Sequence, residues 1–325
     1  MTTLLVATTG GHLAQLVDIA GRITAGGDGA RLWVTHSHAQ SRSLLDGEEV
    51  VYVPYVGVKD VPGVLRNLPV AHRLLTERHL TRVVSTGSGI ALAFLPYLAA
   101  RGIPSHYIES AARVTGPSLS GRLLRSAPRV RVYTQHRELA RGPWRYGGSV
   151  FDGFEAVQTT GTAVIRRAVV TLGTAGEFPF RRLLDALVPL LGNDGALERE
   201  TSDAVETIWQ TGSTPTDGLD ITARSWISPA ELGAAMTRGD VVVSHAGTGS
   251  ALAALRAGRC PVLVPRESAR GEIGDDHQEQ VARELEGRGL ALCRRVDELT
   301  VDDLRLAASR RIDQATDPPM FELVA

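Results

Sequence analysis

The chain has 325 residues, of which 43% are hydrophobic and 22% are charged, a composition typical of a soluble globular protein and unlike that of a disordered or fibrous chain. This length is too great for one ordinary α/β core and predicts two domains of about 150 residues each. The longest uncharged apolar run, residues 90–100, is well short of the roughly 20 residues that a membrane-spanning helix needs.

Charge divides unequally between the two halves. Residues 1–155 contain 17 Lys and Arg against 11 Asp and Glu, whereas residues 156–325 contain 18 against 25. A basic first half suits an anionic surface or substrate. The two cysteines, Cys260 and Cys293, are too few for a disulfide framework and fit a reducing cytoplasm. The start of the chain lacks the pattern of a signal peptide, so we expect a cytoplasmic protein.

Short apolar runs alternate with helical patterns along the chain. The first strand, Thr3–Ala7, leads through a glycine turn into an apolar-periodic helix, Leu13–Ile23. The second half opens in the same way, with a strand at 168–172 and a helix at about 179–191. Further strands are predicted at residues 30–35, 50–54, 83–85, 106–108, 130–134, 207–211, 241–244 and 262–264. Strands that alternate with helices predict parallel sheets with right-handed crossovers, one sheet in each half.

The domain boundary is expected between residues 154 and 162, where the periodicity is lost. We therefore predict an N-terminal domain over residues 1–157 and a C-terminal domain over residues 158–325. The tail, 316–325, contains two adjacent prolines followed by apolar residues, and it could return to the first domain.

Four glycine-containing turns follow predicted strands: Thr9–His12, Ser85–Gly89, Gly173–Gly176 and Ala246–Ser250. At such a turn, unpaired backbone N–H groups and the positive end of the helix dipole favour a phosphate. None of the turns has the Gly-x-Gly-x-x-Gly pattern of dinucleotide sites or the Gly-Lys-Ser/Thr of phosphate loops, and Lys59 is the only lysine. Together the four turns favour a nucleotide or another phosphate-bearing ligand between the domains.

Longer motifs surround these turns. The first half contains "TGGHLAQL" at 9–16, "STGSGIALAF" at 85–94 and "YIESAARVTGPSLSGRLL" at 107–124. The second half contains "VVTLGTAGEFPFRRLLDAL" at 169–187, "SHAGTGSALAALRAG" at 244–258 and "DDHQEQVARELEGRGLA" at 275–291. In these motifs the chain resembles GT-B glycosyltransferases of family 28. It is most similar to two-subunit transferases that extend lipid-pyrophosphate-linked sugars, here fused into one polypeptide, and more distantly to the peptidoglycan transferase that glycosylates lipid I.

The resemblance implies an α/β protein with two Rossmann-like parallel-sheet domains that face a central cleft. It implies an inverting, metal-independent hexosyltransferase, peripheral on the inner face of the membrane and active in polysaccharide or lipid-linked oligosaccharide biosynthesis. Such an enzyme moves a sugar from a nucleotide sugar, here expected to be UDP-linked, to a hydroxyl group of a polyprenyl-linked or other hydrophobic acceptor. We expect no cofactor besides this substrate, no metal and no nucleic-acid partner.

Residue by residue, the resemblance places donor binding in the second half. The turn after strand 241–244 would hold the diphosphate and ribose, Gln278 would reach ribose or sugar hydroxyls, and Trp226 and Ile227 would flank the uracil. The predicted donor-binding residues are Gly173, Thr174, Trp226, Ile227, His245, Ala246, Gly247, Thr248, Gly249, Ser250, Asp276, His277 and Gln278.

One position departs from the family pattern. Relatives carry a glutamate in the helix after the glycine turn, which grips the ribose hydroxyls, and the aligned residue here is Ala253. Glu272, Asp275 or Asp276 could substitute for it, or nucleotide affinity could be weaker, or the donor could differ.

The first half carries the candidates for acceptor binding and catalysis. Inverting transfer needs a base that accepts the proton of the acceptor hydroxyl. His12 and Glu109 are the two catalytic candidates, with His12 ahead because an imidazole titrates near neutral pH; a salt bridge to Arg113 is the structural alternative for Glu109. The predicted acceptor-binding residues are Gly10, Gly11, Thr86, Gly87, Ser88 and Arg113.

A basic segment lies within and after the third motif of the first half. It could contact an acceptor pyrophosphate or an anionic membrane surface, or it could be a solvated helix face. Its members are Arg113, Arg122, Arg125, Arg129 and Arg131.

Other functions share this architecture. A non-hydrolysing sugar-nucleotide 2-epimerase would need no hydrophobic acceptor surface, and a non-catalytic nucleotide-sugar-binding protein would fit the alanine at position 253. A soluble natural-product acceptor also stays open, because a fold does not fix a substrate.

Overall fold

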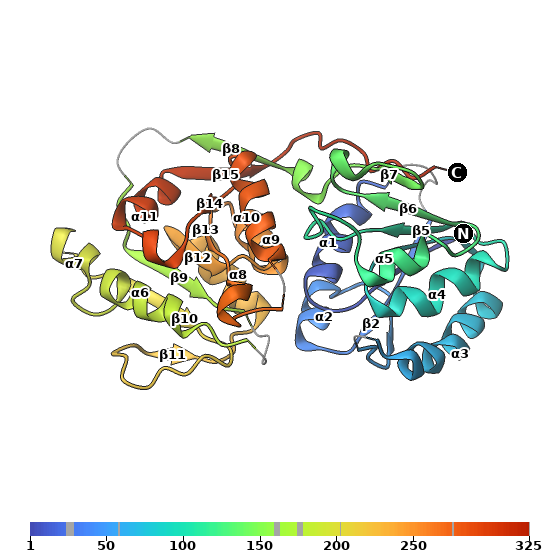
Figure 1. Cartoon of the computed structure of the whole chain (residues 1–325), viewed down its shortest axis with the longest axis horizontal. Helices are drawn as coiled ribbons and strands as arrows, with labels where there is room; N and C mark the ends of the chain where they lie inside the picture. Colours follow the sequence, from blue (N-terminus) through green and yellow to red (C-terminus); the bar gives the residue numbers. More distant parts are fainter. Residues whose placement is uncertain are drawn as a thin grey trace. The chain divides into compact units, whose positions relative to one another are not determined.

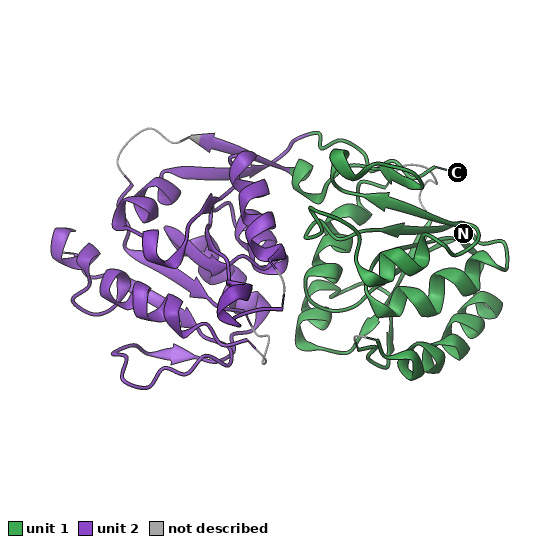
Figure 2. Ribbon diagram, viewed as in Figure 1, with its two compact units in different colours: residues 1–153, 317–325 green, residues 154–316 purple. Residues whose placement is uncertain are grey.

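The chain forms two compact units (Figure 2). The computed structural model describes residues 1–23, 29–57, 59–158, 163–173, 178–201, 203–274 and 276–324. Unit 1 contains residues 1–153 and 317–325, and unit 2 contains residues 154–316.

Unit 1 is built on a parallel sheet of seven strands in the order β3-β2-β1-β4-β5-β6-β7 (Figure 1). The strands are β1 (Thr2–Ala7), β2 (Ala30–His36), β3 (Val50–Val53), β4 (Leu80–Gly87), β5 (Ser105–Ile108), β6 (Val130–Thr134) and β7 (Trp144–Tyr146). The strand order reverses between β1 and β4, and parallel sheets usually bind ligands at the carboxyl ends of the strands beside such a reversal. The glycine turns after β1 and β4 therefore meet at that edge.

The helices of unit 1 cover the sheet with apolar side chains. Leu4 and Val6 of β1 lie in a core cluster with Phe94 of α4 and Leu74 of α3, while Leu5 is also buried. Successive residues of a strand point to opposite faces of the sheet. Buried apolar side chains at consecutive positions therefore show that β1 is covered on both faces. The helices are α1 (Gly11–Ala20), α2 (Ala39–Leu44), α3 (Val61–Glu77), α4 (Gly89–Ala99) and α5 (Leu119–Leu124), with 3₁₀ turns η1 (Arg137–Leu139) and η2 (Val150–Gly153).

Unit 2 repeats the design on a parallel sheet of six strands in the order β11-β10-β9-β12-β13-β14. Its strands are β9 (Arg167–Thr171), β10 (Glu206–Gln210), β11 (Ala223–Arg224), β12 (Val241–His245), β13 (Val262–Val264) and β14 (Leu292–Cys293). Here the order reverses between β9 and β12. The turns that carry Gly173 and Gly247 consequently lie side by side at the carboxyl edge.

The helices of unit 2 are amphipathic. In α6, Leu183, Leu184, Leu187 and Leu191 are buried in the core cluster, at the spacing that places them on one face of a helix. The helices are α6 (Arg181–Leu191), α7 (Ala196–Thr201), α8 (Pro229–Arg238), α9 (Thr248–Arg256), α10 (His277–Gly287) and α11 (Val301–Ala308), with 3₁₀ turns η3 (Ser268–Arg270) and η4 (Val296–Glu298). Within the described ranges, none of the helices combines the length and apolarity needed to span a bilayer.

Two strands outside the parallel sheets set the division between the units. β8 (Phe154–Gln158) pairs antiparallel with β15 (Arg310–Gln314), and both belong to unit 2. The boundary that we expected between residues 157 and 158 therefore falls inside β8, and the division lies at Gly153 instead. The first five residues of the stretch without periodicity, Phe154–Gln158, thus form a strand of their own.

The tail, residues 317–325, packs in unit 1. Phe321 is fully buried and bridges to Ile23, and a Cβ on Gly147 would stand 2.5 Å from its ring. The guanidinium of Arg22 donates to the carbonyl oxygen of Pro319 from Nη2 at 2.8 Å and to that of Ser149 at 2.9 Å. The chain thus begins and ends in unit 1.

Candidate functional site

His12 lies in the first turn of α1, directly after the glycine turn that follows β1. Its Nδ1 is 2.6 Å from the carbonyl oxygen of Thr86, and the Thr86 hydroxyl donates to the His12 carbonyl oxygen at 2.7 Å. A Cβ on Gly87 would stand 3.2 Å from two atoms of the imidazole. The turn after β1 and the turn after β4 are therefore held together through His12.

The surroundings of His12 fix its tautomer and its charge. Because Nδ1 faces a carbonyl oxygen, Nδ1 carries the proton of the neutral ring and Nε2 carries the lone pair. Burial lowers the pKa of His12, while the hydrogen bond to Thr86 and the charge of Glu109 act in the opposite direction and Arg113 lowers it further. The imidazole is accordingly neutral at neutral pH, the form that a general base needs.

The carboxylate of Glu109 is enclosed by donors. It is 2% exposed, and Oε1 accepts from the Tyr107 hydroxyl and the Ser110 backbone N–H, both at 3.1 Å. Oε2 accepts from the backbone N–H of Ser118 at 2.9 Å and from its hydroxyl at 3.0 Å. A Cβ on Gly121 would lie 2.2 Å from Oε2, so that glycine makes room for the carboxylate. These contacts favour His12 over Glu109 as the base, because the Glu109 oxygens are already engaged.

The remaining acceptor-binding candidates of unit 1 lie at the same edge. Gly10 adopts φ 87°, and its N–H donates to Gln40 Oε1 at 2.6 Å. Gly11 is the first residue of α1, and Ser88 is the partly exposed residue before α4. Arg113 is close enough to His12 to influence its pKa. Thr86 is buried, and both its carbonyl oxygen and its hydroxyl group are hydrogen-bonded to His12.

Two buried glutamines that sequence reasoning missed tie this edge together. Gln15 accepts from the Ala111 N–H at 2.8 Å and from Gln135 Nε2 at 2.9 Å, and it donates to Ser110 Oγ at 3.0 Å. Gln135 also donates to the Glu109 carbonyl oxygen at 3.0 Å. Gln15 is 95 to 120 residues from its three partners, so a local pattern gave no signal of these contacts.

In unit 2, His245 occupies the space between two glycines. A Cβ on Gly173 would lie 2.5 Å from the imidazole Cε1, and one on Gly247 would lie 2.3 Å from Nε2. His245 Nδ1 is 3.4 Å from the carbonyl oxygen of Thr171. Burial, followed by the charge of Arg266, lowers the pKa of His245 to about 3, so the ring is neutral. Both glycines are therefore needed to leave room for the histidine ring.

The other predicted residues of this turn lead into α9, which begins at Thr248. Ala246 and Thr248 are buried, whereas Gly249 and Ser250 are partly exposed. The residue before α9 is Gly247, whose lack of a side chain leaves the helix start without a side-chain cap. The first N–H groups of the helix are thus available to an anion. Thr174 lies outside the described residues.

Trp226 and Ile227 differ in exposure. Trp226 is 48% exposed and can offer a ring face, whereas Ile227 is 3% exposed. The Ile227 N–H donates to Gln210 Oε1 at 3.0 Å, and Gln210 Nε2 donates to Thr171 Oγ1 at 2.8 Å. The Ile227 N–H is thus engaged within the protein, and the nucleobase contact expected from the sequence stays a prediction. Gln210, a third buried glutamine absent from the sequence prediction, fixes this segment to the end of β9.

The motif at the start of α10 is held by its own neighbours. Gln278 is 5% exposed and its Oε1 accepts from the Arg266 N–H at 3.1 Å, which leaves the amide nitrogen for a ligand. Asp276 accepts from the Ser268 hydroxyl, and His277 is the first residue of α10.

The candidates to replace the family glutamate are engaged elsewhere or undescribed. The Glu272 carboxylate accepts from Arg182 Nε and Nη2, each at 3.0 Å, and from the Glu267 N–H at 2.9 Å. Asp275 lies outside the described residues. Ala253 packs against an apolar cluster beneath α8 and α9. Glu272 therefore does not offer a free carboxylate in place of the family glutamate, because both of its oxygens already accept hydrogen bonds.

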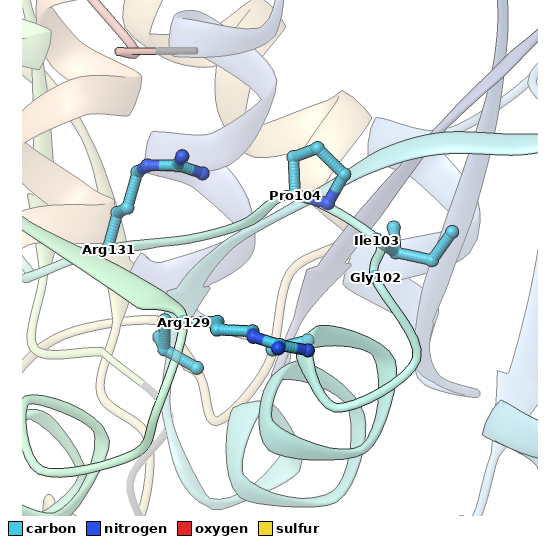
Figure 3. A pocket seen from close by; sticks show the side chains of 7 residues that line it. Gly102, Ile103, Pro104, Arg129 and Arg131 are labelled. Carbon is cyan, nitrogen blue, oxygen red and sulfur yellow. The ribbon is translucent and has the colours of Figure 1, made fainter.

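The basic segment of unit 1 extends to the opposite edge of the sheet. Arg129 and Arg131 line a pocket of about 290 Å³ at the amino ends of β5 and β6, together with Ile103 and Pro104 (Figure 3). None of the predicted catalytic, donor-binding or acceptor-binding residues lines it. In the described ranges, no group of three His, Cys, Asp or Glu side chains is arranged to hold a metal ion.

Known proteins match both the sequence and the fold. Residues 170–317 match the model of the glycosyltransferase family 28 C-terminal domain. The chain is 34% identical over 160 residues to the UDP-N-acetylglucosamine transferase subunit ALG13 of Eremothecium gossypii, a match that covers 48% of this chain and 70% of that protein. The chain belongs to glycosyltransferase family 28. The ALG13 protein of Yarrowia lipolytica is 46% identical over 55 residues, 17% of this chain and 26% of the relative.

Solved structures place this family 28 protein in the GT-B fold. MurG of Acinetobacter baumannii matches with a TM-score of 0.54 and 16% identity, over 94% of this chain and 89% of that one. The glycosyltransferase SnogD from Streptomyces nogalater matches with a TM-score of 0.59 and 20% identity, over 95% and 93%. The family and the fold of two parallel-sheet α/β domains expected from the sequence are thereby confirmed.

Proposed function

We propose that this family 28 protein transfers a sugar from a UDP-sugar to a hydroxyl group of a lipid-linked acceptor, with inversion at the anomeric carbon and without a metal or another cofactor. The observation that carries the proposal is the position of His12, whose Nδ1 lies against the Thr86 carbonyl oxygen so that Nε2 keeps its lone pair, and burial lowers the pKa of this ring. A base in this state at a glycine-rich strand edge suits the deprotonation of an acceptor hydroxyl.

In the proposed reaction, the acceptor oxygen attacks the anomeric carbon from the face opposite the nucleotide. His12 Nε2 accepts the hydroxyl proton as the new C–O bond forms. The bond between the anomeric carbon and the diphosphate oxygen breaks, and UDP leaves with the electron pair. Inversion follows from this single displacement, and the imidazolium returns its proton to solvent.

The donor side of the proposal rests on unit 2. The uncapped start of α9 offers N–H groups to the diphosphate, Trp226 offers a ring face to the base, and Gln278 offers its amide nitrogen to hydroxyls. The name of the ALG13 relative makes UDP-N-acetylglucosamine the first donor to test.

The acceptor side rests on exposed groups of unit 1. On the short helix α5, Leu119 and Leu123 are 45% and 52% exposed beside Arg122 and Arg125. Apolar side chains next to arginines suit an anionic membrane surface, where a polyprenyl-linked acceptor would reside. We accordingly propose a cytoplasmic protein that is peripheral on the membrane.

Turnover with defined substrates tests the proposal. Radiolabelled UDP-N-acetylglucosamine is incubated with a polyprenyl-pyrophosphate-linked sugar in detergent, and the lipid fraction is analysed for an extended product and its anomeric configuration. A β-linked product from the α-linked donor supports the proposal. Epimerised nucleotide sugar without an acceptor product would favour the epimerase instead, and absence of UDP binding at millimolar concentration would exclude both enzymes.

Flotation with liposomes tests the membrane contact separately. Binding to vesicles that contain phosphatidylglycerol, but not to neutral vesicles, is expected for the wild-type protein. The double substitution of Leu119 and Leu123 by Ser should weaken it. Equal binding by the two proteins, or none by either, would remove α5 from the proposal.

A further inference from the structure

A buried arginine stands at the carboxyl edge of the unit 2 sheet. Arg266 follows β13 after Pro265 and is 4% exposed. Its Nη2 donates to the carbonyl oxygens of Leu172 and Phe178, both at 2.9 Å. The guanidinium carbon lies 5.1 Å from the centre of the Phe180 ring, and Nε is buried without a hydrogen-bond partner.

The described part of the chain provides little compensation for the charge of Arg266. Among the described residues, no carboxylate hydrogen-bonds to the guanidinium, and the acid that acts on it electrostatically is Glu272. Glu272 itself forms a two-point ion pair with Arg182. Burial lowers the pKa of Arg266 to about 10, so the group stays protonated at neutral pH. A buried cation with no hydrogen-bonded carboxylate among the described residues is costly to a fold, and a functional use of its charge explains why it is kept.

The position of this charge indicates an anionic partner. Arg266 anchors the carbonyl of Leu172, the next residue is Gly173, and Gly173 is in close contact with His245 at the end of β12. After burial, Arg266 is the largest contribution that lowers the pKa of His245. The guanidinium therefore acts on the same strand edge as the start of α9, where helix N–H groups favour an anion.

We propose that Arg266 is a positioning residue for the diphosphate of the donor: it fixes the Leu172–Gly173 backbone and supplies a permanent positive charge that acts on the phosphates through space. This inference rests on the proposed function, since it assumes a nucleoside diphosphate ligand. It assigns to a single arginine the electrostatic role that lysines or a divalent cation play in many phosphate sites. Its sequence context, "LVPRES", contains none of the glycines that mark the other candidate residues.

A series of ligands separates this role from a merely structural one. Uridine, UMP and UDP share the base and ribose and differ in phosphate charge. Calorimetry gives the affinity of each for the wild-type protein and for Arg266→Gln and Arg266→Lys. If Arg266 acts on the phosphates, Arg266→Gln should lower UDP affinity by about tenfold or more, while uridine affinity changes by less than about twofold. Arg266→Lys keeps the charge and should retain most of the UDP affinity.

Arg22 provides a matched control in the other unit. It is 7% exposed and likewise donates to backbone carbonyls, those of Pro319 and Ser149. Arg22→Gln should lower the thermal midpoint of the protein while leaving the ratio of uridine to UDP dissociation constants unchanged. This control shows whether loss of any buried arginine, with its destabilisation, alters the ratio.

The outcomes are distinguishable. Equal losses of uridine and UDP affinity in Arg266→Gln, or no loss of either, overturn the inference. Absence of UDP binding by the wild-type protein overturns the proposed function instead. If Arg266→Gln does not fold, Arg266→Lys carries the test alone. Raising the pH should neutralise the buried lysine and weaken UDP binding relative to uridine in that variant more than in the wild-type protein, and parallel curves for the two proteins would contradict the inference.

Discussion

The imidazole of His12 packs beside Gly87 so closely that a Cβ added at Gly87 would stand 3.2 Å from ring atoms Cε1 and Nδ1. Gly87 has φ 103°, a conformation that side chains other than hydrogen rarely adopt. The contact joins the end of β4 to the start of α1, and it fixes the ring whose Nδ1 binds the Thr86 carbonyl.

The substitution Gly87→Ala should therefore reduce kcat strongly, by about tenfold or more, because the ring must move away from its hydrogen-bonded position. Gly102→Ala provides the control: Gly102 has φ 85° but open space where its Cβ would be. Both variants should lose about 1–2 kcal/mol of unfolding free energy from backbone strain. Steady-state kinetics and urea unfolding measure the two effects, and equal activity in the two variants would contradict the importance of the contact.

The lowered pKa of His12 predicts how kcat/KM depends on pH. The pKa of His12 is lowered by burial, so the neutral, active ring persists on acidification below the usual histidine value of about 6.5. We expect kcat/KM to be level through pH 7 and to fall only as the pH drops through the lowered value. His12→Ala should reduce kcat by about 10²–10⁴-fold and remove this acid limb. An acid limb centred above pH 7 would contradict the assignment.

Glu109→Gln distinguishes a positioning role from a catalytic one. Removing the carboxylate charge should lower the pKa of His12 further and move the acid limb to lower pH, because that charge raises it. At pH 8 kcat should fall by less than about tenfold, whereas loss of the base itself would cost about 10²–10⁴-fold. Stability should fall by about 1–3 kcal/mol as the Ser118 donors lose an ionised acceptor.

Ser118→Ala is the matched control for Glu109→Gln. It removes the hydroxyl that donates to Oε2 but keeps the carboxylate charge. Its unfolding free energy should fall while the acid limb stays where it is in the wild-type protein. If the acid limb of the pH profile shifts in this variant as well, the loop around Ser118, rather than the charge of Glu109, sets the pKa of His12.

A pair of glycines tests the donor side in the same manner. Gly173 and Gly271 have nearly equal φ angles, 74° and 71°. A Cβ added at Gly173 would lie 2.5 Å from the His245 ring, whereas a Cβ added at Gly271 would meet open space. Gly173→Ala should weaken UDP binding by about tenfold or more as His245 is displaced. Gly271→Ala should change UDP affinity by less than about twofold. Calorimetry measures both, and equal affinities would separate His245 from the nucleotide.

The framework of the fold could be predicted from the sequence because it depends on local periodicity. The strand expected at 130–134 is β6, the one expected at 241–244 is β12 with one residue added, and the helix expected at 179–191 begins two residues later as α6. The short edge strands β7, β11 and β14 have two or three residues each, too few to show an alternation.

The candidate site could be predicted only in part, since its main features are long-range contacts. The glycine turns were found, but close packing against His12 and His245 is also a reason for Gly87, Gly173 and Gly247. The full hydrogen bonding of Glu109 depends on Ser118, which follows nine residues later in an irregular loop. Arg266 reaches a carbonyl 94 residues earlier in the chain, beyond the range of any spacing rule.

The burial of Phe321 has a consequence for the order in which the protein can mature. Unit 1 supplies the first 153 residues, yet one of its fully buried aromatic rings is the fifth residue from the end of the chain. During synthesis, the first 153 residues of unit 1 leave the ribosome before unit 2 is translated. The site that Phe321 occupies in unit 1 is therefore filled only after the whole of unit 2 has been made. A ribosome-bound chain stopped at residue 316 would contain unit 1 without Phe321 in its core.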